Sequence, residues 1–210
     1  MVNASMQLFG FVLAFVGFVA LITSTSMTEW KASSFAGPSI VTAQSMYEGL
    51  WMSCVEQSTG QVQCKVFDSL LEQPAEMQVT RALMITSIFI AAVAAAASVA
   101  GMKCTTCLEG DERYKSKVAL AGGAGFVMAG LCALVATSWY GNRITAQFHE
   151  PLAMAHRYEY GKALFLGWVA SAVSVLGGLI LCCNSVGRGP RQRGRYPQER
   201  SSGSPAMDYV

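Results

Sequence analysis

The sequence predicts an all-α membrane protein, namely a four-helix bundle that carries a small antiparallel β-sheet outside the membrane. The first supporting observation is composition: 52% of the 210 residues are hydrophobic and only 13% are charged, against about 25% charged in soluble proteins. The second is that four long stretches contain no Asp, Glu, Lys or Arg. The third is a segment, between the first two stretches, in which two cysteines accompany strand-forming residues.

Each uncharged stretch is long enough to cross a bilayer. The stretches cover about residues 6–27, 82–102, 118–140 and 163–183. An α-helix rises ~1.5 Å per residue, so about 20 residues cover the hydrocarbon core. Four buried helices of a soluble protein are the alternative, but soluble helices of this length normally show a polar face. No Lys or Arg precedes the first stretch, so we expect a retained helix and not a cleaved signal peptide.

Basic residues indicate which side of the membrane each connecting segment faces. The loop 103–117 contains four Lys or Arg residues and the tail 184–210 contains five, whereas segment 28–81 contains three against six Asp or Glu residues. Basic residues stay on the cytosolic side, so the loop and both termini are predicted in the cytosol, and segments 28–81 and 141–162 outside. We expect residues 1–183 to form the four-span domain, and the Gly-, Pro-, Arg- and Ser-rich tail to be disordered.

Small residues at helical spacing predict close helix packing in two of the spans. Such stripes let helices approach one another in lipid. We expect them to pack within one bundle, and a contact between molecules is the alternative. The stripes are Ala92, Ala96 and Ala100 in the second span, and Ala121, Gly125 and Ala129 in the third.

Cys54 and Cys64 are predicted to face each other across a β-hairpin. Gly60, near the middle of the intervening residues, permits a tight turn with positive φ. Cross-strand partners have Cβ atoms about 4.5–5.5 Å apart, which is near disulfide distance. Because the outside of a cell is oxidising, a disulfide is expected. Two free thiols or a metal site are the alternatives, although two cysteines are too few ligands for a structural zinc ion.

Other residues of segment 28–81 indicate further elements beside this hairpin. Ile40–Thr42 and Tyr47–Trp51 are strand-like in composition. Residues 67–73 predict a short helix before Pro74. Trp30 follows the first span directly, where an indole suits the membrane interface.

A set of residues along the chain forms one recognisable pattern, namely Trp30, Gly49, Leu50, Trp51, Cys54, Cys64, Arg81 and the ending Asp208, Tyr209 and Val210. This pattern resembles the claudins and their broader four-span superfamily, which includes peripheral myelin and epithelial membrane proteins. The resemblance extends from the first helix to the last residue, and within the family it is to claudins one, seven and nineteen.

The resemblance implies a fold and a way of assembling. Claudins form a four-helix bundle under a five-stranded extracellular sheet, polymerise side by side into strands, and meet strands of the opposing cell. By the same resemblance, Leu50 and Trp51 anchor the sheet to the bundle. A side-by-side contact would join Leu70 of one molecule to Phe148 and Tyr160 of the next; packing of these three residues within one molecule is the alternative.

Lys65 bears on charge selection, because in claudins the residue after the second cysteine influences which ions pass. A pore discriminates ions by the sign of the side chains in its throat. Cation-pore claudins tend to carry an acid in this region, so Lys65 argues against a cation pore. It fits a sealing claudin or an anion-selective one, and a plain solvated surface charge is the alternative.

Four cysteines are predicted at the inner membrane face, namely Cys104, Cys107, Cys182 and Cys183. Their position suits reversible palmitoylation. The alternatives are a redox CxxC motif, which expects a βαβ context that the sequence lacks, or a zinc site shared by all four cysteines.

The chain ends in Asp208, Tyr209 and Val210. A free carboxylate after a small apolar side chain can add as a strand to a PDZ groove. Val210 would fill the apolar pocket and Asp208 would face the specificity site. Together with the family resemblance, this ending implies binding to PDZ scaffolds of the zonula occludens type.

The sequence favours a structural role over a catalytic one. It contains no nucleophile–base pair, phosphate loop, metal-ligand cluster or nucleic-acid-binding pattern, so we expect no enzyme activity, cofactor, metal or nucleic acid. The spans carry no ionisable side chain, which disfavours a transporter. The leading hypothesis is a plasma-membrane protein of tight junctions that seals the paracellular space, with itself, other claudins, PDZ scaffolds and lipids as partners. An anion-selective pore, or an adhesion or myelin-type four-span protein without strands, are the alternatives.

Overall fold

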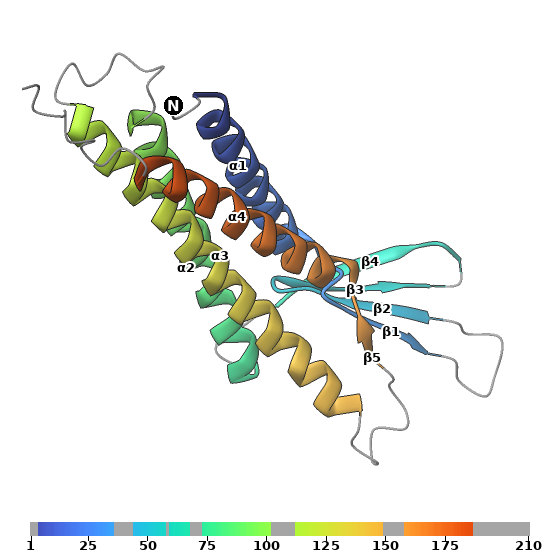
Figure 1. Cartoon of the computed structure of the whole chain (residues 1–210). Helices are drawn as coiled ribbons and strands as arrows, with labels where there is room; N and C mark the ends of the chain where they lie inside the picture. The colour runs from blue at the N-terminus through green and yellow to red at the C-terminus, as the bar shows by residue number, and fades with distance from the viewer. Residues whose placement is uncertain are drawn as a thin grey trace, which may run out of the picture.

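The computed structural model describes residues 4–35, 44–57, 59–67, 73–101, 112–148 and 158–186. It shows a bundle of long helices with a β-sheet projecting from one end (Figure 1). The predicted fold class is therefore confirmed. The helices are α1 (Ala4–Ser26), α2 (Ala75–Gly101), α3 (Glu112–Phe148) and α4 (Lys162–Val186), and the strands are β1 (Lys31–Phe35), β2 (Gln44–Glu48), β3 (Met52–Glu56), β4 (Val62–Val66) and β5 (Tyr158–Tyr160).

Many small side chains lie inside the bundle, beside a few large ones such as Phe126, and many large apolar side chains face outward. All four helices are long and apolar enough to cross a membrane. Their packing order is α1, α4, α3, α2, so that α3 lies between α4 and α2. Alanines such as Ala91 and Ala133 are fully buried, while Phe89 and Val169 are exposed. This arrangement suits a lipid environment, where close backbone approach replaces the hydrophobic effect as the source of helix association.

The small-residue stripe predicted for the second span lies on the wrong face. Ala92 and Ala96 are exposed, and the residues of α2 that pack inside are Ala91, Ala94 and Ser98. In the third span, Ala129 is buried but Ala121 is exposed. The prediction failed because small residues occupy both faces of α2, so spacing alone did not identify the buried face.

Buried hydroxyl groups link neighbouring helices. Ser24 of α1 donates a hydrogen bond to the carbonyl of Ala163 at 2.7 Å, and Ser87 of α2 donates one to the carbonyl of Ala129 at 2.8 Å. A polar group buried without a partner would be costly in an apolar environment. These bonds therefore help to fix which helix faces meet.

The described strands form one antiparallel sheet of five strands, the number that the claudin resemblance implies, and their order is β4-β3-β2-β1-β5. Cys54 and Cys64 are direct cross-strand partners, and Gly60 has φ 78°, so the predicted hairpin is present. The strand predicted over Tyr47–Trp51 is shorter: β2 ends at Glu48, and the chain turns at Gly49.

Two other predicted elements fall outside the described residues. They are the strand at Ile40–Thr42 and, apart from its two end residues, the helix over residues 67–73.

The turn after β2 has a local cause. A Cβ atom on Gly49 would lie 2.6 Å from Cα of Thr28, so the chain passes too close to the end of α1 to admit a side chain there.

Candidate functional site

Two tryptophans join the sheet to the end of α1. The indole N–H of Trp30 donates to the carbonyl of Ser24 at 2.9 Å, and that of Trp51 donates to the carbonyl of Thr25 at 3.0 Å. The last carbonyls of a helix have no partner within the helix. The indoles supply that partner, and Trp30 also packs edge-on against Tyr140 of α3, with ring centroids 5.5 Å apart.

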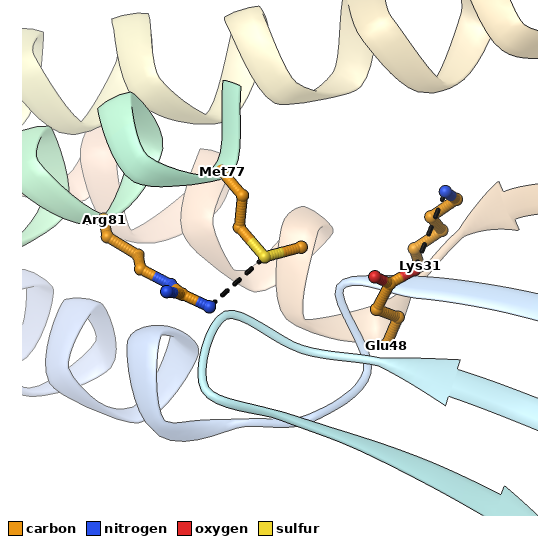
Figure 2. Close-up of polar contacts among 4 residues, drawn as sticks. All are labelled: Lys31, Glu48, Met77 and Arg81. Atoms are coloured by element: carbon orange, nitrogen blue, oxygen red, sulfur yellow. Dashed lines mark hydrogen bonds and ion pairs between the residues drawn. The ribbon is translucent and has the colours of Figure 1, made fainter. Parts of the chain in front are cut away.

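Arg81 of α2 holds the turn between β2 and β3 from the other side. Its side-chain Nε donates to the carbonyl of Leu50, and Leu50 itself is fully buried. The guanidinium carbon lies 5.4 Å from the ring centroids of both Trp51 and Phe67. Its Nη2 also lies 3.3 Å from the sulfur of Met77 (Figure 2). The structure therefore gathers Trp30, Leu50, Trp51 and Arg81, which are far apart in the sequence, into one junction.

The start of α4 completes this junction. The backbone N–H of Gly161 donates to the carbonyl of Trp30 at 3.1 Å, and that of Ala163 donates to the carbonyl of Glu29 at 3.0 Å. A Cβ atom on Gly161 would collide with the backbone of Glu29 and Trp30. Glycine is thus required here for α4 and β5 to approach β1 so closely.

β4 is one of the two edge strands of the sheet, and a disulfide links it to β3. Cys54 and Cys64 are disulfide-bonded, as predicted, and Cys54 is buried. All five residues of β4 are exposed, including Lys65. Strand pairing to β3 and this bond both hold β4, so the disulfide contributes to the position of Lys65.

One face of the sheet carries a row of charged and polar side chains. The register aligns Lys65, Ser53, Glu48, Lys31 and Tyr160 across the five strands. Within this row, Nζ of Lys31 lies 3.7 Å from a carboxylate oxygen of Glu48 (Figure 2). Burial lowers the pKa of Lys31 from its ordinary value, and the nearby Glu48 and Glu76 oppose that effect.

A second ion pair lies beside the first, at the ends of the helices. Arg143 of α3 contacts Glu76 of α2 at 3.1 Å. Both ion pairs line a small hollow of about 60 Å³ between sheet and bundle, together with Pro74, Met77, Tyr140 and Ile144. In the part of the chain that the structure describes, no group of three or more His, Cys, Asp or Glu residues could hold a metal ion.

A model of the PMP-22/EMP/MP20/Claudin family matches residues 4–181. The chain belongs to this family. Claudin-1 of Mus musculus is 50% identical over 215 aligned residues that cover 100% of both chains. Claudin-7 of Rattus norvegicus is 46% identical over 211 residues, again covering 100% of both chains. Claudin-19 of Homo sapiens is 50% identical over 184 residues, covering 87% of this chain and 82% of the relative. The predicted claudin resemblance is thereby confirmed.

The three residues predicted for contacts between claudin molecules are only partly described. Leu70 lies outside the described residues, and Phe148 is the last residue of α3 with a side chain that is not described. The Tyr160 side chain is 41% exposed, and its hydroxyl hydrogen-bonds with that of Thr145. Its ring packs edge-on against Trp168, with centroids 5.9 Å apart. The predicted contact stays a prediction.

The two cysteines at the end of α4 lie in different environments. Sγ of Cys182 is directed at α3, 3.8 Å from the carbonyl of Leu120, whereas Cys183 is exposed. Cys104 and Cys107 lie outside the described residues, and so do Asp208, Tyr209 and Val210. Palmitoylation and PDZ binding therefore stay predictions.

Sequence reasoning missed the Lys31–Glu48 and Glu76–Arg143 ion pairs that line the hollow. Lys31 and Glu48 counted only toward the charge of their segment, because their pairing depends on the register of β1 and β2. Glu76 and Arg143 come from helices whose relative rotation is set by packing. One signal in the sequence could have suggested the first pair. Lys31 directly follows Trp30 and Glu48 directly precedes Gly49, so both residues flank positions of the claudin pattern.

Proposed function

We propose that this protein is a structural component of tight junctions that assembles into strands and seals the paracellular space against ions and solutes. The observation that carries this proposal is the similarity to claudins over the whole length of the chain. Its role is mechanical and electrostatic rather than catalytic. Its partners are further copies of itself and other claudins, in the same membrane and in the opposing one.

In this proposal, both termini and the loop between α2 and α3 lie in the cytosol, and the sheet lies outside. The excess of Lys and Arg in loop 103–117 and in the tail supports this orientation. The Cys54–Cys64 disulfide of the sheet agrees with it, because disulfides persist in the oxidising space outside the cell.

Lys65 is the residue we assign to charge selection. It is exposed on the edge strand β4, where a positive side chain repels cations that approach the sheet. This favours a seal against sodium. The same observation supports the second candidate, an anion-selective paracellular pore. Such a pore differs from a seal in that its strands leave a path for chloride.

Strand assembly would use the contact of Leu70 with Phe148 and Tyr160 of the next molecule. An apolar side chain that enters an aromatic pocket is a common interface anchor. Tyr160 already packs against Phe165 and Trp168, which would make one wall of such a pocket rigid.

On the cytosolic side, we assign acylation to Cys104, Cys107 and Cys183, and a weaker role to Cys182, whose thiol is directed at α3. Val210 and Asp208 would bind a PDZ groove of a zonula occludens scaffold. Deletion of Val210 should abolish binding of the tail to such a PDZ domain, and unchanged binding would contradict this assignment.

The assembly claim is tested by expression in fibroblasts that make no claudin. Freeze-fracture microscopy should reveal continuous strands at cell contacts with the wild-type protein, and fragmented strands with Leu70→Ala. Protein that reaches the contacts without forming strands would contradict the proposal and favour a simple adhesion role. Intact strands with Leu70→Ala would show that Leu70 packs within its own molecule.

A further inference from the structure

The charged row of the sheet contains more than Lys65. Successive side chains of a strand point to opposite faces, so the aligned residues Lys65, Ser53, Glu48, Lys31 and Tyr160 share one face. Along this row the charges are positive at Lys65, negative at Glu48 and positive at Lys31. The carboxylate of Glu48 therefore stands between two lysines.

Lys31 and Glu48 are held together at the base of the sheet. Their charged atoms are 3.7 Å apart, and their side chains are only 12% and 24% exposed, respectively. Removing a charge from water is costly unless it is paired. The apolar surroundings, which include Met77 and Ile144, therefore favour the formed ion pair.

The neighbouring charges do not replace Lys31 as the partner of Glu48. Arg143 is paired with Glu76 at 3.1 Å on the other side of the hollow. Of the side chains that line the hollow, Lys31 and Arg143 are the two cations, and Glu48 and Glu76 are the two anions. Loss of Lys31 would thus leave one more carboxylate than cation around the hollow.

We propose that Lys31 is a second charge determinant of the paracellular face, which acts by neutralising Glu48 in the row of the sheet that carries Lys65. This inference rests on the proposed function, in which that face borders the path of ions. With Lys31 present, the row has a net positive charge. Without it, the charges of Lys65 and Glu48 cancel, and the row no longer repels cations.

The expected size of the effect follows from the spacing of the strands. β4 and β2 are separated by β3, so Glu48 lies about 10 Å from Lys65, which is two strand spacings. In water, a unit charge at this distance changes the local concentration of a monovalent ion about twofold without screening, and about 1.3-fold when the interaction is screened over one Debye length. Because sodium and chloride shift in opposite directions, their ratio changes by the square of this factor, about 1.7-fold. The Debye length is also about 10 Å at 0.1 M salt, so the effect should grow when the salt is diluted.

The test measures dilution potentials across a leaky epithelial monolayer that expresses each variant, and converts them into the sodium-to-chloride permeability ratio. The variants are Lys31→Met, Glu48→Gln, the double variant of both, and Lys65→Met. Lys162→Met is the matched control, because Lys162 also pairs with a glutamate, Glu29 at 3.3 Å, but is 82% exposed at the start of α4 and outside the row. Surface biotinylation and freeze-fracture confirm that each variant is assembled.

Lys31→Met should raise the ratio about 1.7-fold at 0.1 M salt, Glu48→Gln should lower it by about the same factor, and the double variant should return it to the wild-type value. Lys162→Met should leave it unchanged. If Lys31→Met fails to reach the surface, Glu48→Gln decides, and an unchanged ratio there overturns the inference. If Lys31→Met and Glu48→Gln both leave the ratio unchanged while Lys65→Met shifts it, the proposed role of Lys31 is refuted and that of Lys65 stands. An unchanged ratio with Lys65→Met as well would refute charge selection by this face altogether.

Discussion

Removal of the Cys54–Cys64 disulfide should loosen the edge of the sheet and leave the bundle intact. The two cysteines are separated by 10 positions in the sequence. Loop-closure entropy for a loop of this size gives a stabilisation of about 2.7 kcal/mol, which is about a hundredfold in an equilibrium constant. Because every residue of β4 is exposed, little side-chain burial would compensate for the loss. A two-stranded hairpin on its own is marginal in water.

The change to make is Cys54→Ser together with Cys64→Ser, so that no unpaired thiol remains. Hydrogen exchange of the protein in nanodiscs, read by mass spectrometry, should show lost protection in the peptide that contains β3 and β4, and unchanged protection in the helices. Cys132→Ser is the control, since Cys132 is a free cysteine in α3. Unchanged protection of β4 in the double variant would refute the reasoning, because pairing with β3 alone would then hold the edge.

Three further predictions concern the junction and the inner end of the bundle. Arg81→Met removes a charge-assisted hydrogen bond to Leu50 and two ring contacts, so it should destabilise the protein by about 2–4 kcal/mol; an unchanged melting temperature in detergent would contradict this. Gly161→Ala should abolish delivery to the cell surface, because its Cβ would collide with the backbone of Glu29. The control is Gly60→Ala: Gly60 has φ 78° but open space around it, so this change should destabilise the protein by only about 1–2 kcal/mol and preserve delivery. Equal delivery of the two variants would contradict this prediction. In a background without Cys104 and Cys107, Cys183→Ser should remove most of the acylation detected by thiol exchange, and Cys182→Ser little of it; the reverse order would show that the exposure of the thiol does not govern acylation.

The sequence predicted those features that depend on local composition. Long stretches without charge specify helices that cross a membrane, because each residue of a spanning helix must tolerate lipid or the bundle interior. The hairpin followed from the spacing of Cys54 and Cys64 around Gly60, and both the pairing and the positive φ are present. In these cases neighbouring residues contain the whole signal.

The features that sequence reasoning missed depend on contacts between distant segments. The buried face of α2 could not be chosen, because Ala92 and Ala91 are equally small and only packing against α3 distinguishes them. β5 joins the sheet by pairing with β1, which lies far away in the chain. The Lys31–Glu48 ion pair requires the register of β1 and β2, which neither strand encodes by itself.

The most direct test of the sealing claim is electrical. The protein is expressed in a leaky epithelial monolayer, alone and as Lys65→Asp, and the transepithelial resistance is recorded with the sodium permeability from a dilution potential. The proposal predicts higher resistance and reduced sodium permeability for the wild type, both partly reversed by Lys65→Asp. Unchanged or lower resistance with a preference for chloride would contradict a seal and identify an anion-selective pore.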